Sequence, residues 1–264
     1  MNALVLMVNK NFITPLNTVL YGLLKIKFSY DIVLFYDVYF KELEQLVAAY
    51  SDLKIKLKQI DCKLYSSLKW TINNRDWEIN PFYRYEIFKL KEYEKIMYLD
   101  LDVVILKDFT DIFDIKGDFC AVELAKISNL AYVAFGQRGF NAGVMLISNK
   151  YLNDNVYNEL IELSAKTLYN GNQKPLNHYF GDKICFLDCC YNLTTDLLSL
   201  ERIDAARIIH FIGDKKPWNN SIENAFCDYV KRISGEHLLF KSYSLYKKEL
   251  KESLELISRY TSNK

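Results

Sequence analysis

Two carboxylates stand one residue apart directly after a mainly apolar segment of the chain. Residues 95–99 read Lys-Ile-Met-Tyr-Leu, and Asp100, Leu101 and Asp102 follow them. Carboxylate oxygens are hard ligands for Mg²⁺ or Mn²⁺, and an ion held there could bridge a diphosphate and neutralise its charge. The alternative is that both side chains only cap a turn, where Asp is common.

A second segment whose side chains could take part in chemistry lies about a hundred residues later. His210 ends an apolar run and is followed by Gly213, Lys216, Pro217 and Trp218. A neutral imidazole can complete a divalent-metal site with two carboxylates, and an ammonium can pair with phosphate oxygens. A strand-ending His before an ordinary turn with solvated lysines is the alternative. The sequence does not itself show that this segment meets the carboxylate pair.

Apolar runs and helical periodicity alternate along the chain and predict the elements that must position these groups. Strands are predicted at residues 3–8, 31–36, 54–60, 95–99, 141–147 and 206–211. Helices are predicted at residues 14–25, 41–50, 81–90 and 151–168. Alternating strands and helices favour an α/β domain with a largely parallel, covered sheet. In such a sheet, ligands bind beyond the carboxyl ends of strands, where the carboxylate pair should lie.

Composition narrows the class of protein further. The 264 residues are 50% hydrophobic, enough for one large domain with a sizeable core. Lys and Arg number 34 against 33 Asp and Glu, so no global charge favours nucleic acid. The N-terminus does not read as a secretory signal, and the six cysteines form no C-x-x-C pair. Reduced thiols in a cytoplasmic protein are therefore expected.

An ordered series of segments resembles the glycogenin-like glycosyltransferase family 8. The segments are 82–85, 92–106, Phe140-Asn141-Ala142-Gly143-Val144, Asn172-Gln173 with Asn177, Tyr191-Asn192, and His210-x-x-Gly213-x-x-Lys216-Pro217-Trp218. The resemblance covers about residues 1–220, and it is specific through the order and spacing of the segments together.

This resemblance implies a GT-A fold, which is a single Rossmann-like α/β domain with a mostly parallel central sheet. It assigns residues 1–220 to the transferase domain and leaves 221–264 as a C-terminal helical appendage. It also implies transfer of a hexose, glucose or galactose, from a UDP-sugar with retained configuration. The implied cofactor is Mn²⁺ or Mg²⁺, with Asp100, Asp102 and His210 as its ligands.

The remaining site residues are carried over position by position. The resemblance places Leu6, Val8, Asn9 and Phe12 at the uracil and ribose, and Asp100 and Leu101 beside the donor. It places Asn141, Ala142 and Gly143 at the transferred sugar, and Lys216, the Gly213 backbone and Arg84 at the diphosphate. Each has a plainer alternative: Phe12 could be core, Asn141 and Gly143 could shape a turn, and Arg84 could be a solvated charge.

One position departs from the family pattern. The family commonly has Asp where this chain has Asn172, and Gln173 follows it. Asn can hydrogen-bond a sugar hydroxyl but cannot act as a nucleophile or base at neutral pH. With Asn172, Gln173 and Arg84 as the expected catalytic residues, the sequence favours attack by the acceptor on the same face over double displacement.

Several alternatives remain open at this level. The chain could be a catalytically inactive UDP-sugar-binding relative, a self-glucosylating protein like glycogenin, or a nucleotidyltransferase. The acceptor could be a glycan, a lipid-linked glycan or a protein, and a homodimer is compatible with the resemblance. The charged tail contains basic and aromatic residues that could rest on a membrane surface, although interleaved acids favour packing on the main domain.

Overall fold

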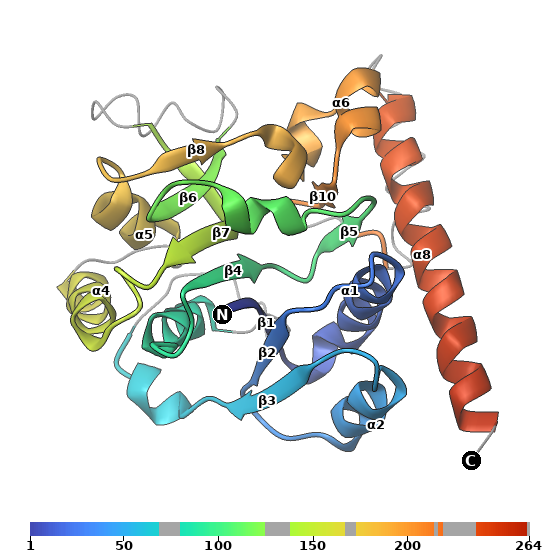
Figure 1. Ribbon diagram of the computed structural model, residues 1–264, viewed down its shortest axis with the longest axis horizontal. Helices are drawn as coiled ribbons and strands as arrows, with labels where there is room; N and C mark the ends of the chain where they lie inside the picture. The colour runs from blue at the N-terminus through green and yellow to red at the C-terminus, as the bar shows by residue number, and fades with distance from the viewer. Residues whose placement is uncertain (69–79, 125–137, 167–172, 214–215, 219–235, 263–264) are drawn as a thin grey trace.

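The computed structural model describes residues 1–68, 80–124, 138–166, 173–213, 216–218 and 236–262. A seven-stranded sheet with the order β3-β2-β1-β4-β7-β6-β8 forms its centre (Figure 1). The strands are β1 (Asn2–Val8), β2 (Asp31–Tyr36), β3 (Ile55–Gln59), β4 (Lys95–Leu99), β6 (Phe119–Glu123), β7 (Phe140–Ser148) and β8 (Cys185–Leu187). The predicted α/β class is confirmed.

One strand of this sheet runs against the others. β7 pairs antiparallel with both β4 and β6, whereas the pairs β1–β2, β2–β3, β1–β4 and β6–β8 are parallel. The sheet is therefore mostly parallel, as predicted. Because β7 is reversed, its first residues lie at the edge where β1 and β4 end. The start of β7 and the end of β4 thus meet at one edge of the sheet.

Both faces of the inner part of the sheet are covered, which explains why β1 and β7 are buried along nearly their whole length, whereas the edge strand β3 alternates and is mostly exposed. On β1, Leu4, Leu6 and Val8 face a core shared with α1 (Ile13–Lys25) and α2 (Lys41–Ala49). Ala3, Val5 and Met7 face the opposite core. That second core is built with η3 (Pro81–Lys89), α4 (Asp154–Lys166) and α5 (Gln173–Phe180). Burial on both sides is typical of parallel sheets.

A small three-stranded sheet stands beside the large one and carries the late histidine. Its order is β5-β10-β9, with β5 (Val103–Ile105), β10 (Ile208–His210) and β9 (Leu193–Thr194). His210 lies opposite Val103 on one side and Thr194 on the other. The backbone N–H of Phe211 also donates to the carbonyl of Asp102 at 2.8 Å. The pairing of β5 with β10 therefore joins the two segments that the sequence left apart.

The C-terminal helix α8 (Glu236–Ser262) runs along the outside of α1 (Figure 1). The Asn17 amide donates to Ser253 Oγ at 2.9 Å, and Tyr246 packs on the small sheet. The remaining short elements are η1 (Lys10–Phe12), η2 (Cys62–Tyr65), η4 (Thr110–Asp114), η5 (Cys189–Tyr191), η6 (Thr195–Leu197) and α6 (Leu200–Ala205). Among the helices that the structure describes, none has the length and apolar character to cross a membrane.

Candidate metal centre

Three metal-ligating side chains converge where β4 gives way to β5. Asp100 and Asp102 occupy the short connection between these strands, and His210 ends β10 beside it. One ligand atom from each of the three lies within 4.8 Å of the others. His210 Nε2 is 3.1 Å from Asp102 Oδ1 and 3.9 Å from Asp100 Oδ2. Two carboxylates and an imidazole facing one point form a donor set that suits a divalent ion.

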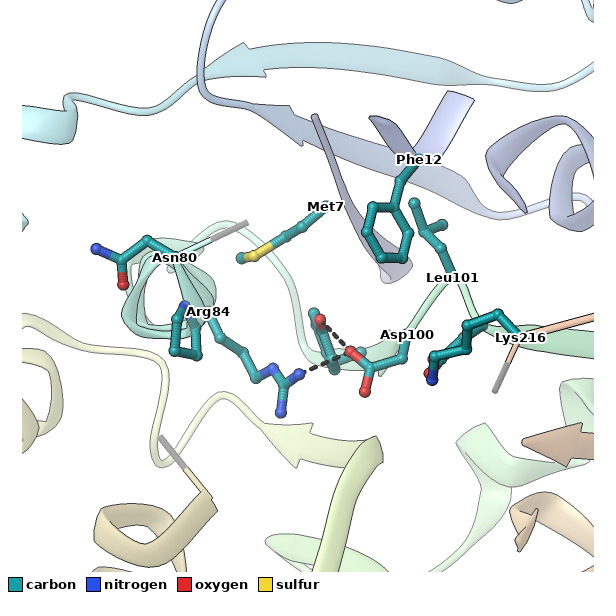
Figure 2. A pocket seen from close by; sticks show the side chains of 10 residues that line it. Met7, Phe12, Asn80, Arg84, Asp100, Leu101 and Lys216 are labelled. Atoms are coloured by element: carbon teal, nitrogen blue, oxygen red, sulfur yellow. Dashed lines mark hydrogen bonds and ion pairs between the residues drawn. The ribbon is translucent and has the colours of Figure 1, made fainter. Parts of the chain in front are cut away.

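Asp100 is held by two donors on one of its oxygens. The Tyr98 hydroxyl donates to Oδ1 at 2.6 Å, and Arg84 donates to the same atom at 2.7 Å (Figure 2). Oδ2, which faces His210, keeps its lone pairs for another partner. Burial opposes the charge on Arg84, but Asp100 outweighs this and raises the pKa of the guanidinium further above its usual value. The Arg84 guanidinium therefore stays charged beside the Asp100 carboxylate.

Asp102 lies between two nitrogen groups. Lys216 Nζ donates to Asp102 Oδ2 at 2.6 Å and to the carbonyl of Phe211 at 2.6 Å. Burial disfavours the charged carboxylate, but His210 and Lys216 outweigh it and hold the pKa of Asp102 well below its usual range. The carboxylate is consequently ionised at neutral pH, as a metal ligand must be.

The far side of the His210 ring faces neutral amides. Its Nδ1 is 3.0 Å from Asn192 Oδ1, and the Asn192 amide nitrogen donates to Asn141 Oδ1 at 2.9 Å. The backbone N–H of Gly143 donates to the same oxygen of Asn141, also at 2.9 Å. The sequence alone gives Asn192 no role, and the resemblance of Tyr191-Asn192 to the family is its only signal.

A cavity of about 220 Å³ opens beside the three ligands. It is lined by Met7, Phe12, Asn80, Pro81, Arg84, Tyr98, Asp100, Leu101, Asp102 and Lys216. Figure 2 shows Phe12, Met7 and Leu101 on one side and the charged groups on the other. The cavity therefore has an apolar wall on one side and charged side chains on the other.

The residues predicted after the first strand lie in different environments. Phe12 lines the cavity, and its ring meets Trp218 edge to face at 5.9 Å. Asn9 caps η1 by accepting from the N–H of Asn11 at 3.0 Å. The side chains of Leu6 and Val8 are fully buried in the core with α1. Only the backbone of these two residues could face a ligand.

The segment at the start of β7 is held from two sides. Gln173 Oε1 accepts from the N–H of Ala142 at 3.3 Å, and Arg84 donates to the Ala142 carbonyl at 3.1 Å. Two of the three expected catalytic residues thus bond to the backbone of one residue, Ala142. Asn172, the third, lies outside the described residues. Gly213 has φ +83°, a left-handed conformation that favours glycine.

The sheet order and the single reversed strand agree with the GT-A fold of solved glycosyltransferases. The chain matches the solved galactosyltransferase LgtC, in complex with donor and acceptor sugar analogues, with a TM-score of 0.70 over 93% of this chain and 95% of that one. It matches GlyE of Streptococcus pneumoniae with a TM-score of 0.65 over 96% of this chain and 63% of that one. The identities of 16% and 22% make this a likeness of fold.

The family follows from the sequence itself. The family model described as glycosyl transferase family 8 matches residues 3–221, so the chain belongs to that family. It is 32% identical to the pneumococcal glycosyltransferase GlyE over 199 residues, 64% of this chain and 47% of the relative. It is 28% identical to glycogenin of Komagataella phaffii over 212 residues, 71% of this chain and 50% of the relative. The chain spans about a quarter to a half of the length of the first curated relatives it matches.

Proposed function

We propose that the chain transfers a hexose, glucose or galactose, from a UDP-sugar to an acceptor hydroxyl with retention of configuration. The observation that carries this proposal is the meeting of Asp100, Asp102 and His210 beside the cavity, in a chain of this family. The donor set of two carboxylates and an imidazole suits Mn²⁺ or Mg²⁺. When bound, such an ion supplies Lewis-acid stabilisation of the diphosphate charge.

The chain's own cation at this point is Lys216. Its ammonium group lies on Asp102 Oδ2 and at the cavity wall, so a small rotation would bring it from the carboxylate to a diphosphate oxygen. Lys216 would then stabilise the negative charge that develops on UDP as it leaves. The backbone of Gly213, in its left-handed conformation, would lie beside the diphosphate. Arg84 would instead hold Asp100 in place, because the two side chains form an ion pair.

The apolar side of the cavity would bind the base. Phe12 presents a ring to the cavity, supported edge to face by Trp218. Stacking of uracil on this ring is the arrangement that an aromatic wall favours. The backbone of Leu6 and Val8 and the amide of Asn9 stand directly before it in the chain. Asn141, Ala142, Gly143 and Leu101 would complete the wall beside the transferred sugar.

The proposed transfer exchanges one C–O bond for another on the same face of the sugar. The bond between the anomeric carbon and the β-phosphate oxygen breaks, and its electron pair stays with UDP. The acceptor oxygen forms the new bond to the anomeric carbon, and its proton passes to the leaving phosphate oxygen. No enzyme nucleophile is needed, which agrees with Asn172 in place of a carboxylate. Gln173 would hold the sugar by hydrogen bonds.

The test is UDP release from a panel of UDP-sugars, with Mn²⁺ and with EDTA. We expect release from one sugar that requires the ion and is abolished in Asp102→Ala. Asp52→Ala, which removes an exposed carboxylate elsewhere, is the matched control. The anomeric proton of the product, read by NMR, reports retention. A covalent glycosyl-enzyme trapped on any side chain would overturn the same-face mechanism.

The same assay separates the alternatives. A mass increase of the protein, with no added acceptor, would identify a self-glucosylating protein, as the similarity to glycogenin allows. Adding glycan, lipid-linked glycan and protein acceptors in turn would identify an external acceptor. If no UDP-sugar is turned over and calorimetry detects UDP binding, the chain is an inactive binding relative. Asn172→Asp would then be the first variant to examine.

A further inference from the structure

A histidine ligates a metal through a ring nitrogen that carries no proton. The imidazole has two nitrogens, and the hydrogen bond made by one decides which of them holds the proton in the neutral ring. In this site Nε2 faces Asp100 and Asp102, whereas Nδ1 faces Asn192. Ligation through Nε2 therefore requires that Nδ1 be the protonated nitrogen.

The hydrogen bonds behind His210 have a direction that can be deduced from one fixed end. The backbone N–H of Gly143 can only donate, so the Asn141 atom that it meets is the carbonyl oxygen. That oxygen also meets the Asn192 side chain, which must present its NH₂ group there. The other atom of the Asn192 amide is then the oxygen, and it lies 3.0 Å from His210 Nδ1. An oxygen at that point accepts a hydrogen bond from the N–H of Nδ1.

Close packing prevents the side-chain amides of Asn141 and Asn192 from flipping end for end. Asn192 is fully buried, and His210 and Asn141 are 4% and 8% exposed. Asn192 directly precedes β9, whose Thr194 pairs with His210, so the backbone holds the amide beside the ring. A Cβ atom on Gly143 would lie 2.2 Å from His210 Cε1. The glycine thus lets the backbone donor and the ring occupy the same small space.

We infer that Asn192 is a positioning residue that keeps the proton of His210 on Nδ1 and so presents an unprotonated Nε2 to the metal. Asn141 orients Asn192, and the Gly143 N–H orients Asn141. This inference rests on the proposed metal site and adds to it the residues that select the tautomer of its histidine. Asn141 accordingly acts behind the histidine as well as beside the sugar.

The first test measures binding of Mn²⁺ alone, from the loss of the free-ion signal in electron paramagnetic resonance. Asn192→Leu keeps the volume and removes the acceptor, and we expect about a 10- to 100-fold weaker affinity. Asn192→Asp keeps an oxygen toward Nδ1, although its second oxygen now faces Asn141 Oδ1. We expect it to recover most of the loss, to within about tenfold of the wild type.

The matched control is Asn17→Leu. Asn17 is also a buried amide with side-chain partners, Tyr50 and Ser253, but it lies on α1 away from the metal centre. We expect this variant to lose stability and to keep its Mn²⁺ affinity. Equal Mn²⁺ affinity in the wild type and in folded Asn192→Leu would overturn the inference.

A second readout does not depend on metal or turnover. The chain has three histidines, so ¹⁵N-histidine NMR of the metal-free protein can be assigned with His210→Gln. At alkaline pH, where the ring is neutral, we expect the proton of His210 on Nδ1 in the wild type and on Nε2, facing Asp102, in Asn192→Leu. A bare Nδ1 in the wild type would refute the inference. Failure of the wild type to bind Mn²⁺ would instead refute the proposed metal site, and the NMR result would still decide the role of Asn192.

Discussion

Asp100 and His210 reach the same point from two sides, and opposite kinds of neighbour hold them. Asp100 is held by the cation of Arg84 and the hydroxyl of Tyr98, both on one oxygen. His210 is held by the uncharged amide of Asn192. A charged ligand leaves water at low cost only beside an opposite charge, whereas a neutral ring needs only a correctly oriented acceptor.

This contrast separates two contributions to the site. The support of Asp100 is an ion pair, so its loss leaves a partly buried charge without a partner and lowers the stability of the fold. The support of His210 carries no charge, so its loss changes the chemistry of the ligand more than the stability of the fold. The variants below test that division, beginning with the largest expected effect.

Asp100→Ala should have the largest effect, because it removes a proposed metal ligand and also leaves Arg84 without its ion-pair partner. We expect kcat/KM for UDP-sugar turnover to fall by about a thousandfold or more. The measurement is metal-dependent UDP release, with Asp52→Ala as the control. Turnover within tenfold of the wild type would remove Asp100 from the metal centre.

Arg84→Met should act mainly on stability. The Asp100 carboxylate would lose its ion-pair partner, and we expect the free energy of unfolding to fall by about 3 kcal/mol. In urea titrations, the double variant Asp100→Ala/Arg84→Met should lose less than the sum of the single variants, because no unpaired charge remains. Strict additivity would show that the pair contributes nothing to the fold.

Gly143→Ala should disturb the His210 side by steric overlap. A Cβ would lie 2.2 Å from His210 Cε1, so the ring must move, at a cost of about 2 kcal/mol in the free energy of unfolding. We expect weaker Mn²⁺ binding as well. Gly22→Ala is the matched control, since its Cβ would lie 2.9 Å from Ile105 Cβ, away from the metal centre. It should lose stability and keep its Mn²⁺ affinity.

Ser253→Ala should have the smallest effect, because it touches neither side of the metal centre. It removes the acceptor of the Asn17 amide between α1 and α8. We expect a loss of about 1 kcal/mol in the free energy of unfolding, measured in urea, and unchanged UDP release. A change in UDP release beyond a factor of two or three would show that α8 affects the site, and would contradict the expectation that this contact affects stability alone.

The sequence predicted the parts of the fold that apolar runs encode. The strands β1, β2, β4 and β7 lie where long apolar segments indicated them, and α1 begins at Ile13, one residue before its predicted start. The strands β6 and β8 were not predicted. β8 has only three residues, which is too few for a periodic pattern.

The candidate metal ligands were easier to predict than the residues that hold them in place. Asp100, Asp102 and His210 stand out because polar residues end apolar strands. The reversal of β7 and the pairing of β5 with β10 depend on tertiary structure, and no local pattern encodes them. The contact of His210 with Asn192 exists only because β9 and β10 are neighbours. Arg84 was expected at the diphosphate, and its partner Asp100 could not be read from spacing.

The packing of α8 on α1 has a consequence for biosynthesis. Asn17 and Ser253 are 236 residues apart in the chain, yet they share a buried hydrogen bond. At a synthesis rate of about 5–20 residues per second, α1 would wait roughly 10–50 s for this partner. The sheet can assemble during that interval, but the outer side of α1 stays uncovered. Docking of α8 is therefore a late, long-range step, and until it is complete the nascent protein exposes a surface that chaperones and proteases can recognise.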